Sequence, residues 1–289
     1  MTETTRNEGF LLLNKKPGIT SFEALKEVKK AFSTGQVGHT GTLDKFAEGL
    51  LIALVGRAVK LTPWFSGGDK RYEGTIRFGV ETDTLDPEGA PLAEGEMPSL
   101  DALVCALASF RGNILQRPPA YSAIHIGGKR ASKLARNGAI PEMPKRPVSV
   151  YALELRSYRP PFAEVYIHCS KGTYIRSLAR DIALAAGSRA HLASLKRTHI
   201  AGFSVEDAVN PAVGALKPLN QQAFETLGIS CVTVSEEEAG KIIHGQALEN
   251  IPELQGETAA GIFRDNGELL AVLKKEQHRW RYGYVYARE

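Results

Sequence analysis

The sequence predicts an α+β protein, with a mixed, mostly antiparallel central sheet in a larger domain over residues 1–229 and a small β-rich domain over residues 230–289. Helix and strand patterns mix along the first part without regular β-α-β alternation, which favours such a sheet over a doubly wound parallel one. Short strands separated by tight turns dominate the second part, as in a small closed β module. The length of 289 residues also exceeds the usual size of a single hydrophobic core.

Hydrophobic periodicity and turn residues place the elements of the larger domain. Thr20, with Glu23 three residues later, forms a capping box, which predicts a helix that ends near Phe32. Residues 82–89 (TDTLDPEG) lack the ligand spacing of a calcium loop and are typical of a turn. Strands are expected at residues 10–13, 70–80, 121–126, 148–157, 163–169 and 191–200. Helices are expected at residues 20–32, 47–55, 99–110, 131–136 and 173–186.

The smaller domain shows a clear hairpin. Residues 265–268 (DNGE) predict a tight turn between strands at 261–264 and 269–273. The last strand alternates in polarity. Its aromatic residues are expected on one side of the sheet, and these are Trp280, Tyr282, Tyr284 and Tyr286.

Composition excludes several classes of protein. Hydrophobic residues make up 43% of the chain and charged residues 24%, as in ordinary globular proteins. No segment approaches the ~20 apolar residues that cross a bilayer, so we expect no membrane association. The three cysteines are far apart in the sequence, which argues against structural zinc and disulfides and fits a reducing cytoplasm. The glycines match neither the Gly-x-Gly-x-x-Gly nor the Walker pattern, and we expect no cofactor and no metal.

Positive charge is concentrated in the larger domain. Residues 230–289 carry 7 basic and 10 acidic side chains, which leaves 29 basic against 22 acidic over residues 1–229. The basic residues cluster at 26–30, 129–136 and 171–199. One such cluster is usually a solvated face, but three in one domain favour a polyanionic partner.

Residues 38–44 (GHTGTLD) are the most informative segment. Two glycines in seven residues indicate unusual backbone dihedrals or a close approach of another chain. At the expected start of the 47–55 helix, the Asp44 carboxylate would be partly shielded from water, where its protonation is tunable. The alternative for Asp44 taken alone is a simple helix N-cap.

Six sequence blocks together resemble the TruB family of tRNA pseudouridine synthases. The 38–44 block resembles the catalytic motif of that family, and the other blocks follow in the order of the family. They are residues 16–21 (KPGITS), 70–89 (from KRY to DPEG), 117–123 (RPPAYSA), 170–178 (SKGTYIRSL) and 190–197 (AHLASLKR). Residues from 231 onward resemble, more loosely, a PUA-like RNA-binding domain.

The resemblance implies a pseudouridine synthase fold and isomerisation of uridine 55 in the tRNA T loop without a cofactor. It makes Asp44 the essential aspartate, and Arg176 the cation that keeps this carboxylate ionised. Tyr72 matches the residue that stacks on the target base. The remaining matched positions are Tyr174 and Leu195 as pocket walls, His39 as the residue that replaces the flipped nucleotide, and Lys16 in the N-terminal motif.

The sequence departs from the family at one position, because Lys45 stands where the family usually has proline. Without that proline, Asp44 is expected on a more flexible loop, with a cation beside it. The insertion at about 126–146 resembles the thumb with which stand-alone bacterial enzymes grip the T loop. It favours a monomer that needs no protein or guide RNA over a guide-dependent synthase. A non-catalytic tRNA-binding or tRNA-folding protein is the alternative from another functional class.

Overall fold

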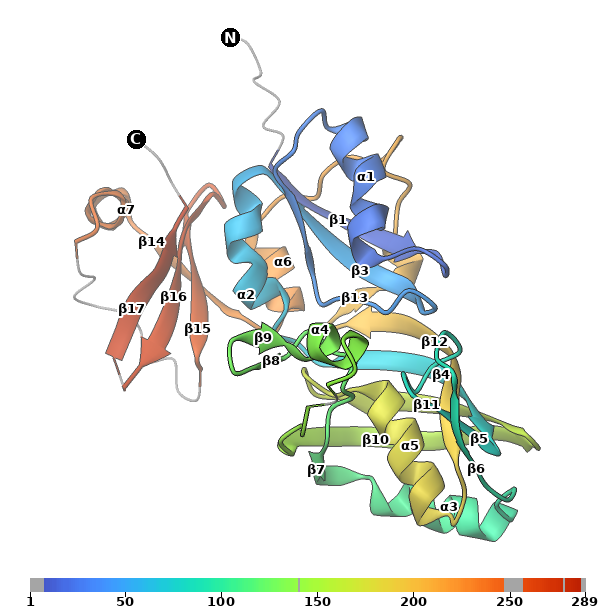
Figure 1. The fold of residues 1–289 in the computed structure, drawn as a ribbon. Coiled ribbons are helices and arrows are strands. Elements are labelled where there is room, and N and C mark those ends of the chain that lie inside the picture. The colour runs from blue at the N-terminus through green and yellow to red at the C-terminus, as the bar shows by residue number, and fades with distance from the viewer. Residues whose placement is uncertain (1–7, 140, 247–256, 278, 287–289) are drawn as a thin grey trace. The chain divides into compact units, whose positions relative to one another are not determined.

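The computed structural model describes residues 8–139, 141–246, 257–277 and 279–286, and these form two compact units. Unit 1 comprises residues up to Asp44, residues 49–68 and residues from 199 onward. Unit 2 comprises Lys45–Glu48 and Asp69–Thr198. The predicted α+β class with a mostly antiparallel sheet is confirmed (Figure 1). The predicted domain boundary at residue 229 stays a prediction.

Unit 1 is built around a strand that is buried on both faces. In chain order its elements are β1 (Gly9–Lys15), α1 (Ser21–Ala31), β2 (Val37–Thr40), β3 (Glu48–Val55), η1 (Gly56–Leu61), α2 (Thr62–Phe65), β13 (Phe203–Ser204), η2 (Val205–Asp207), α6 (Gln221–Thr226), β14 (Ser230–Val234), α7 (Glu236–Ile243), β15 (Ala259–Arg264), β16 (Leu269–Glu276) and β17 (Arg279–Val285). Strands β1 and β2 both pair antiparallel with β3. The predicted capping box of Thr20 and Glu23 is present at the start of α1.

The helix predicted at residues 47–55 is wrong, because the structure places strand β3 there. Leu50, Ile52 and Leu54 pack into one hydrophobic core, and the alternate residues 51, 53 and 55 pack into another. A continuous apolar run carries no periodicity that separates a buried helix from a strand with two buried faces. Because there is no helix here, Asp44 is not a helix N-cap, and this alternative is also wrong.

The C-terminal strands form the predicted β-rich module. Its sheet has the order β14-β15-β16-β17, and α7 packs on one face (Figure 1). The other face shares a core with β1 and β3, in which four phenylalanine rings lie in series at centroid distances of 5.3, 6.1 and 5.4 Å. These rings are Phe10, Phe65, Phe224 and Phe263.

The expectation that the aromatic residues of the last strand share one side is also wrong. Trp280 and Tyr282 pack against the core beneath α7, whereas Tyr284 and Tyr286 belong to the core shared with β1 and β3. The pairing of β17 with β16 shifts by one residue at Gly283. Such a bulge moves every later side chain to the opposite face.

Unit 2 is a sheet covered by helices. In chain order its elements are β4 (Lys70–Phe78), β5 (Val80–Thr82), β6 (Pro91–Glu94), α3 (Leu100–Ser109), β7 (Gly112–Gln116), β8 (His125–Ile126), β9 (Lys129–Arg130), α4 (Ala131–Arg136), β10 (Arg146–Arg159), β11 (Phe162–Cys169), α5 (Ile175–Ala185) and β12 (Ala190–Ile200), which continues into unit 1. The sheet order is β12-β4-β11-β10-β7. Helix α3 packs against α5 and β10.

Two local predictions in unit 2 have different outcomes. The strand predicted at 121–126 is wrong for most of its length, because only His125–Ile126 form a short strand. The preceding residues instead supply a backbone carbonyl, that of Tyr121, to a buried arginine. The helix predicted at 131–136 is confirmed as α4, which follows the β8-β9 hairpin in the insertion.

Candidate active site

The loop that carries Asp44 joins β2 to β3 in unit 1. Asp44 is half-buried, and the preceding Leu43 is fully buried. The hydroxyl of Ser21, the first residue of α1, donates to the Leu43 carbonyl at 3.0 Å and accepts from the Leu43 amide at 2.9 Å. Gly41 takes a positive φ of 70°, which glycine adopts without strain. Helix α1 therefore fixes the backbone one residue before the carboxylate.

The N-terminal motif also folds around a buried lysine. Lys15 is 1% exposed, and its ammonium donates to the carbonyls of Lys16 and Ile19 at 3.0 and 2.7 Å. The predicted site residue Lys16 is exposed, at the turn that Lys15 holds. His39 lies on β2, half-buried and opposite Ala53. These residues and Asp44 all belong to unit 1.

Lys45 follows Asp44 directly but belongs to unit 2. Its ammonium pairs with Glu88 at 3.5 Å, and both side chains are about half exposed (51% and 45%). Glu88 sits in the turn predicted at residues 82–89. The position that carries proline in the family thus holds a lysine, which ties the chain after Asp44 to this turn.

Arg176 is the centre of a buried clamp in unit 2. Its guanidinium donates to the Thr84 carbonyl at 2.7 Å, to an Asp86 carboxylate oxygen at 3.2 Å and to the Tyr121 carbonyl at 3.0 Å. The side chains of Arg176 and Asp86 are each only 6% exposed. A cation in the first turn of α5 opposes the helix dipole, and Asp86 offsets this cost.

The turn at 82–89 is shaped to present Asp86. The other oxygen of this carboxylate accepts from the Thr84 hydroxyl at 2.6 Å and from the Glu88 amide at 3.0 Å. A Cβ on Gly89 would lie 2.3 Å from the Thr84 hydroxyl oxygen, so only glycine fits there. Sequence reasoning identified the turn but missed Asp86 as the partner of Arg176.

Tyr72 lies on the buried face of β4, beside two buried cations. Arg197 on β12 is 2% exposed and hydrogen bonds to the Tyr72 side chain. Burial lowers the pKa of Arg197, and the bond to Tyr72 opposes this shift. Burial, followed by the charge of Arg197, lowers the pKa of Lys70 to about 8. Arginine has no hydrogen-bond acceptor, so the Tyr72 hydroxyl oxygen accepts this bond and the hydroxyl hydrogen is directed away from Arg197.

The two other predicted wall residues also lie in unit 2. A Cβ on Gly74, two residues after Tyr72, would lie 3.6 Å from Leu195 Cδ1. Leu195 and Tyr72 therefore share one face, and each is 7% exposed. The half-buried Tyr174 is held at its backbone by Gln116, whose amide accepts from the Tyr174 N–H at 2.8 Å and donates to its carbonyl at 3.1 Å.

Sequence reasoning missed Ser21, Asp86 and Arg197 as site residues. All three lie within the blocks that carried the family resemblance, and this was the available signal.

Within the described ranges, no three His, Cys, Asp or Glu side chains gather as the ligands of a metal would. No helix of the described part combines the length and apolar character needed to cross a membrane.

Comparison with known proteins identifies the family. The family model described as TruB family pseudouridylate synthase (N terminal domain) matches residues 29–175. A protein from Borreliella afzelii, named tRNA pseudouridine synthase B, is 42% identical over 287 residues, covering 96% of this chain and 99% of its own. A protein of the same name from Gluconacetobacter diazotrophicus is 36% identical over 288 residues, with 93% and 94% covered.

Solved structures share the fold at lower identity. A Cbf5-Nop10-Gar1 complex contains a chain that superposes with a TM-score of 0.70 at 23% identity, covering 98% of this chain and 84% of that chain. A chain from an H/ACA RNP bound to a substrate RNA containing 2'-deoxyuridine superposes with a TM-score of 0.66 at 21% identity, covering 92% and 78%. The expected architecture of the catalytic and C-terminal parts is thereby confirmed.

Proposed function

The chain belongs to the TruB family of pseudouridylate synthases, and we propose from this that it isomerises uridine 55 in the T loop of tRNA. Enzymes of this family are isomerases. The relatives at 36% and 42% identity span nearly the whole chain and are named for tRNA, which supports tRNA as the substrate. The net positive charge of residues 1–229 supports a polyanionic partner.

In the proposed reaction the N1–C1′ bond breaks, the uracil turns over, and a C5–C1′ bond forms. The proton on C5 is lost to solvent, and N1 gains one. The Asp44 carboxylate drives the cleavage, either by attack on C1′ or by helping to release the base as a glycal. Both routes need an ionised carboxylate next to the sugar.

We infer that Arg176 keeps Asp44 ionised. The observation that carries this inference is the turn at 82–89, which holds Arg176 through Asp86 and Lys45 through Glu88. A peptide bond joins Lys45 to Asp44, and consecutive Cα atoms lie about 3.8 Å apart. One turn therefore controls both the guanidinium and the residue next to the carboxylate.

The remaining site residues receive roles that match their chemistry. Tyr72 stacks on the uracil ring, and Leu195 and Tyr174 form the walls of its pocket. His39 occupies the gap that the flipped nucleotide leaves in the T loop, which offsets part of the cost of flipping. Lys16 contacts the RNA from the N-terminal turn.

Tritium release from tRNA labelled with [5-³H]uridine tests the proposed function. The wild-type protein should release tritium without any added protein or guide RNA, as expected of a stand-alone cytoplasmic monomer. Binding of tRNA without release would establish the alternative, a tRNA-binding or tRNA-folding protein. Release that requires a guide RNA would place the chain among the guide-dependent synthases.

Asp44→Asn tests the assigned carboxylate. We expect this variant to release no tritium and to bind tRNA with nearly unchanged affinity, because only the charge is removed. Glu94→Gln is the matched control, since it removes an exposed carboxylate charge from β6, outside these contacts. An active Asp44→Asn enzyme would exclude Asp44 from its proposed role.

A further inference from the structure

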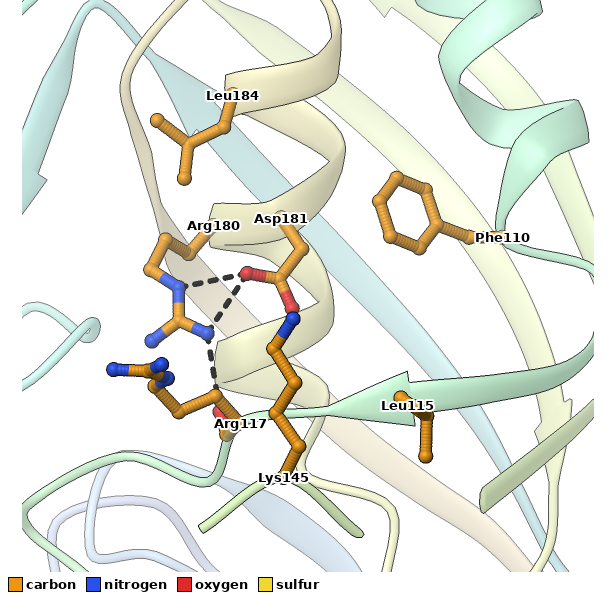
Figure 2. Close-up of a pocket in the computed structure, with 7 residues that line it drawn as sticks. All are labelled: Phe110, Leu115, Arg117, Lys145, Arg180, Asp181 and Leu184. Carbon is orange, nitrogen blue, oxygen red and sulfur yellow. Dashed lines mark hydrogen bonds and ion pairs between the residues drawn. The ribbon is translucent and has the colours of Figure 1, made fainter. Parts of the chain in front are cut away.

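A cavity of about 500 Å³ lies on the outer side of α5 in unit 2. In Figure 2, Phe110 and Leu115 lie on one side of Asp181, and Leu184 lies on the other side, beside Arg180. Phe110, Leu115 and Leu184 supply apolar surface, and Arg117, Lys145 and Arg180 supply cations. The volume falls within the range of small-molecule and nucleotide sites.

One carboxylate, that of Asp181, stands among these cations. It is bound by its neighbour Arg180, whose Nε donates to Asp181 Oδ1 at 2.8 Å. Burial raises the pKa of Asp181, and the charge of Arg180 opposes that shift. The charges of Arg180 and Asp181 cancel, so the net positive charge of the cavity comes from Arg117 and Lys145. Both side chains are exposed and available to an anion.

The apolar side chains are open to solvent. Leu115 is 66% exposed, Leu184 is 45% exposed, and Phe110 is half-buried. Apolar surface next to the exposed cations Arg117 and Lys145 matches a group with a planar ring at one end and an anion at the other. A nucleotide has this construction, because its base stacks on apolar or aromatic groups while its phosphate binds Lys and Arg.

The cavity is mechanically joined to the clamp around Arg176. Arg180 donates to the Arg117 carbonyl at 3.0 Å, and Arg176 donates to the Tyr121 carbonyl at 3.0 Å. Two arginines one turn apart on α5, a rise of about 6 Å, thus hold the two ends of the 117–121 segment. This segment runs from the buried clamp to the rim of the cavity.

We propose that this cavity binds a second nucleotide of the RNA substrate, at a position other than the target uridine. Its base packs against Phe110, Leu115 and Leu184, and its phosphate lies between Arg117 and Lys145. The occupant is an unpaired nucleotide, because a base inside a duplex is stacked away from the protein. The proposal rests on the proposed function, since it takes the same RNA as the ligand.

Binding of a fluorescent T-arm RNA hairpin over a range of salt concentrations tests the charged half. The Arg117→Gln, Lys145→Gln double variant should weaken binding by about tenfold and reduce the slope of log Kd against log salt by about 1 to 1.5, as for two lost single-strand phosphate contacts. Arg156→Gln with Arg159→Gln is the matched control, since it removes two charges from β10 outside the cavity. An equal change in slope for both pairs would overturn the proposal.

A scan of hairpins with single abasic positions tests the apolar half. In the wild type, one position outside the target uridine should cost about tenfold in affinity when its base is removed. Leu184→Asp should weaken the intact hairpin by a similar factor and abolish that positional penalty. If no penalty depends on Leu184, the cavity does not bind a base. Tritium release by the wild type separates this failure from failure of the proposed function.

Discussion

Arg57 in unit 1 and two cations of unit 2, Lys70 and Arg197, are held under opposite conditions. In unit 1, the Arg57 guanidinium donates to Glu8 at 3.0 Å and to the Tyr286 carbonyl at 2.8 Å, and its centre lies 4.6 Å from the centroid of the Tyr286 ring. Burial tends to lower the pKa of Arg57, but the bond and charge of Glu8 outweigh it and raise this pKa. In unit 2, burial dominates and lowers the pKa of both Lys70 and Arg197.

This difference separates a cation stabilised by its carboxylate partner from cations whose charge is opposed by burial. Arg57 joins the last described residue, Tyr286, to the N-terminal segment, and the fold gains from its charge. Burial disfavours the charged forms of Lys70 and Arg197, which lie next to Tyr72, the residue that we assign to base stacking. Perturbed ionisable groups of this kind concentrate at sites that act on a ligand. The comparison therefore agrees with the roles that we propose for Tyr72 and Arg176 in unit 2.

The largest effect is expected from Arg176→Met. Loss of this guanidinium leaves the Asp86 carboxylate buried without its cation, which should lower the free energy of unfolding by about 3–5 kcal/mol. Turnover should fall by about a hundredfold or more, because a preorganised charge at the proposed site is lost. Chemical denaturation and tritium release measure the two effects. Arg176→Lys should recover part of the stability, and full turnover in either variant would contradict the assignment.

Lys70→Met should stabilise the protein while weakening its function. The lowering of the Lys70 pKa from 10.5 to about 8 corresponds to a cost of about 3 kcal/mol at neutral pH. Below pH 8 the folded and unfolded chains both hold the proton, and the full cost is present. Between about pH 8 and 10.5 the unfolded chain binds more protons than the folded one, so the wild-type stability rises with pH.

The measurement for Lys70 is thermal or urea unfolding from pH 7 to 10.5. The stability gain of Lys70→Met should be largest at pH 7 and should shrink as pH rises through this window, while affinity for the hairpin RNA falls. A gain that does not change with pH would show that packing, not charge, is responsible. Lys171→Met, at an exposed neighbouring position, is the control.

Arg57→Met should give a smaller effect that is confined to stability. The lost charge-assisted hydrogen bonds should lower the free energy of unfolding by about 1.5–3 kcal/mol. Turnover per folded molecule should stay within about twofold, because the pair lies in the structural network of unit 1. A large fall in kcat at full folding would remove the contrast between the two units.

The smallest effect is expected from Lys45→Gln. The Lys45–Glu88 pair is about half exposed, and such pairs contribute about 0–1 kcal/mol. Stability should therefore change little. Turnover should fall by less than about threefold, since the pair positions the Asp44 loop without entering the chemistry. Lys45→Pro, which introduces the residue usual in the family, sharpens the test: faster turnover would indicate that loop rigidity limits the wild type.

The particular errors of sequence analysis show where local patterns fail. Within the 47–55 run, residues 50–55 are apolar at every position, and the assignment depended on whether one or both faces would be buried. Only the elements that pack on the two faces decide that, namely α1 on one face and η1, α2 and α6 on the other. The aromatic residues of the last strand alternate in the sequence, but the extra residue Gly283 reverses their faces midway. Asp86 looked like turn chemistry because its partner Arg176 is ninety residues away in the sequence.

By itself, the sequence determined the elements with strong local causes, namely the capped helix α1, the amphipathic α5, the alternating β4 and the hairpin at 265–268. It also determined the family, since six ordered motifs each need particular residues at fixed spacing. The tertiary structure alone decided which charges meet: Arg176 with Asp86, Arg197 with Tyr72, and Arg57 with Glu8. Hydrogen bonds and ion pairs act over a few ångströms, and only the folded chain brings residues distant in sequence within that range.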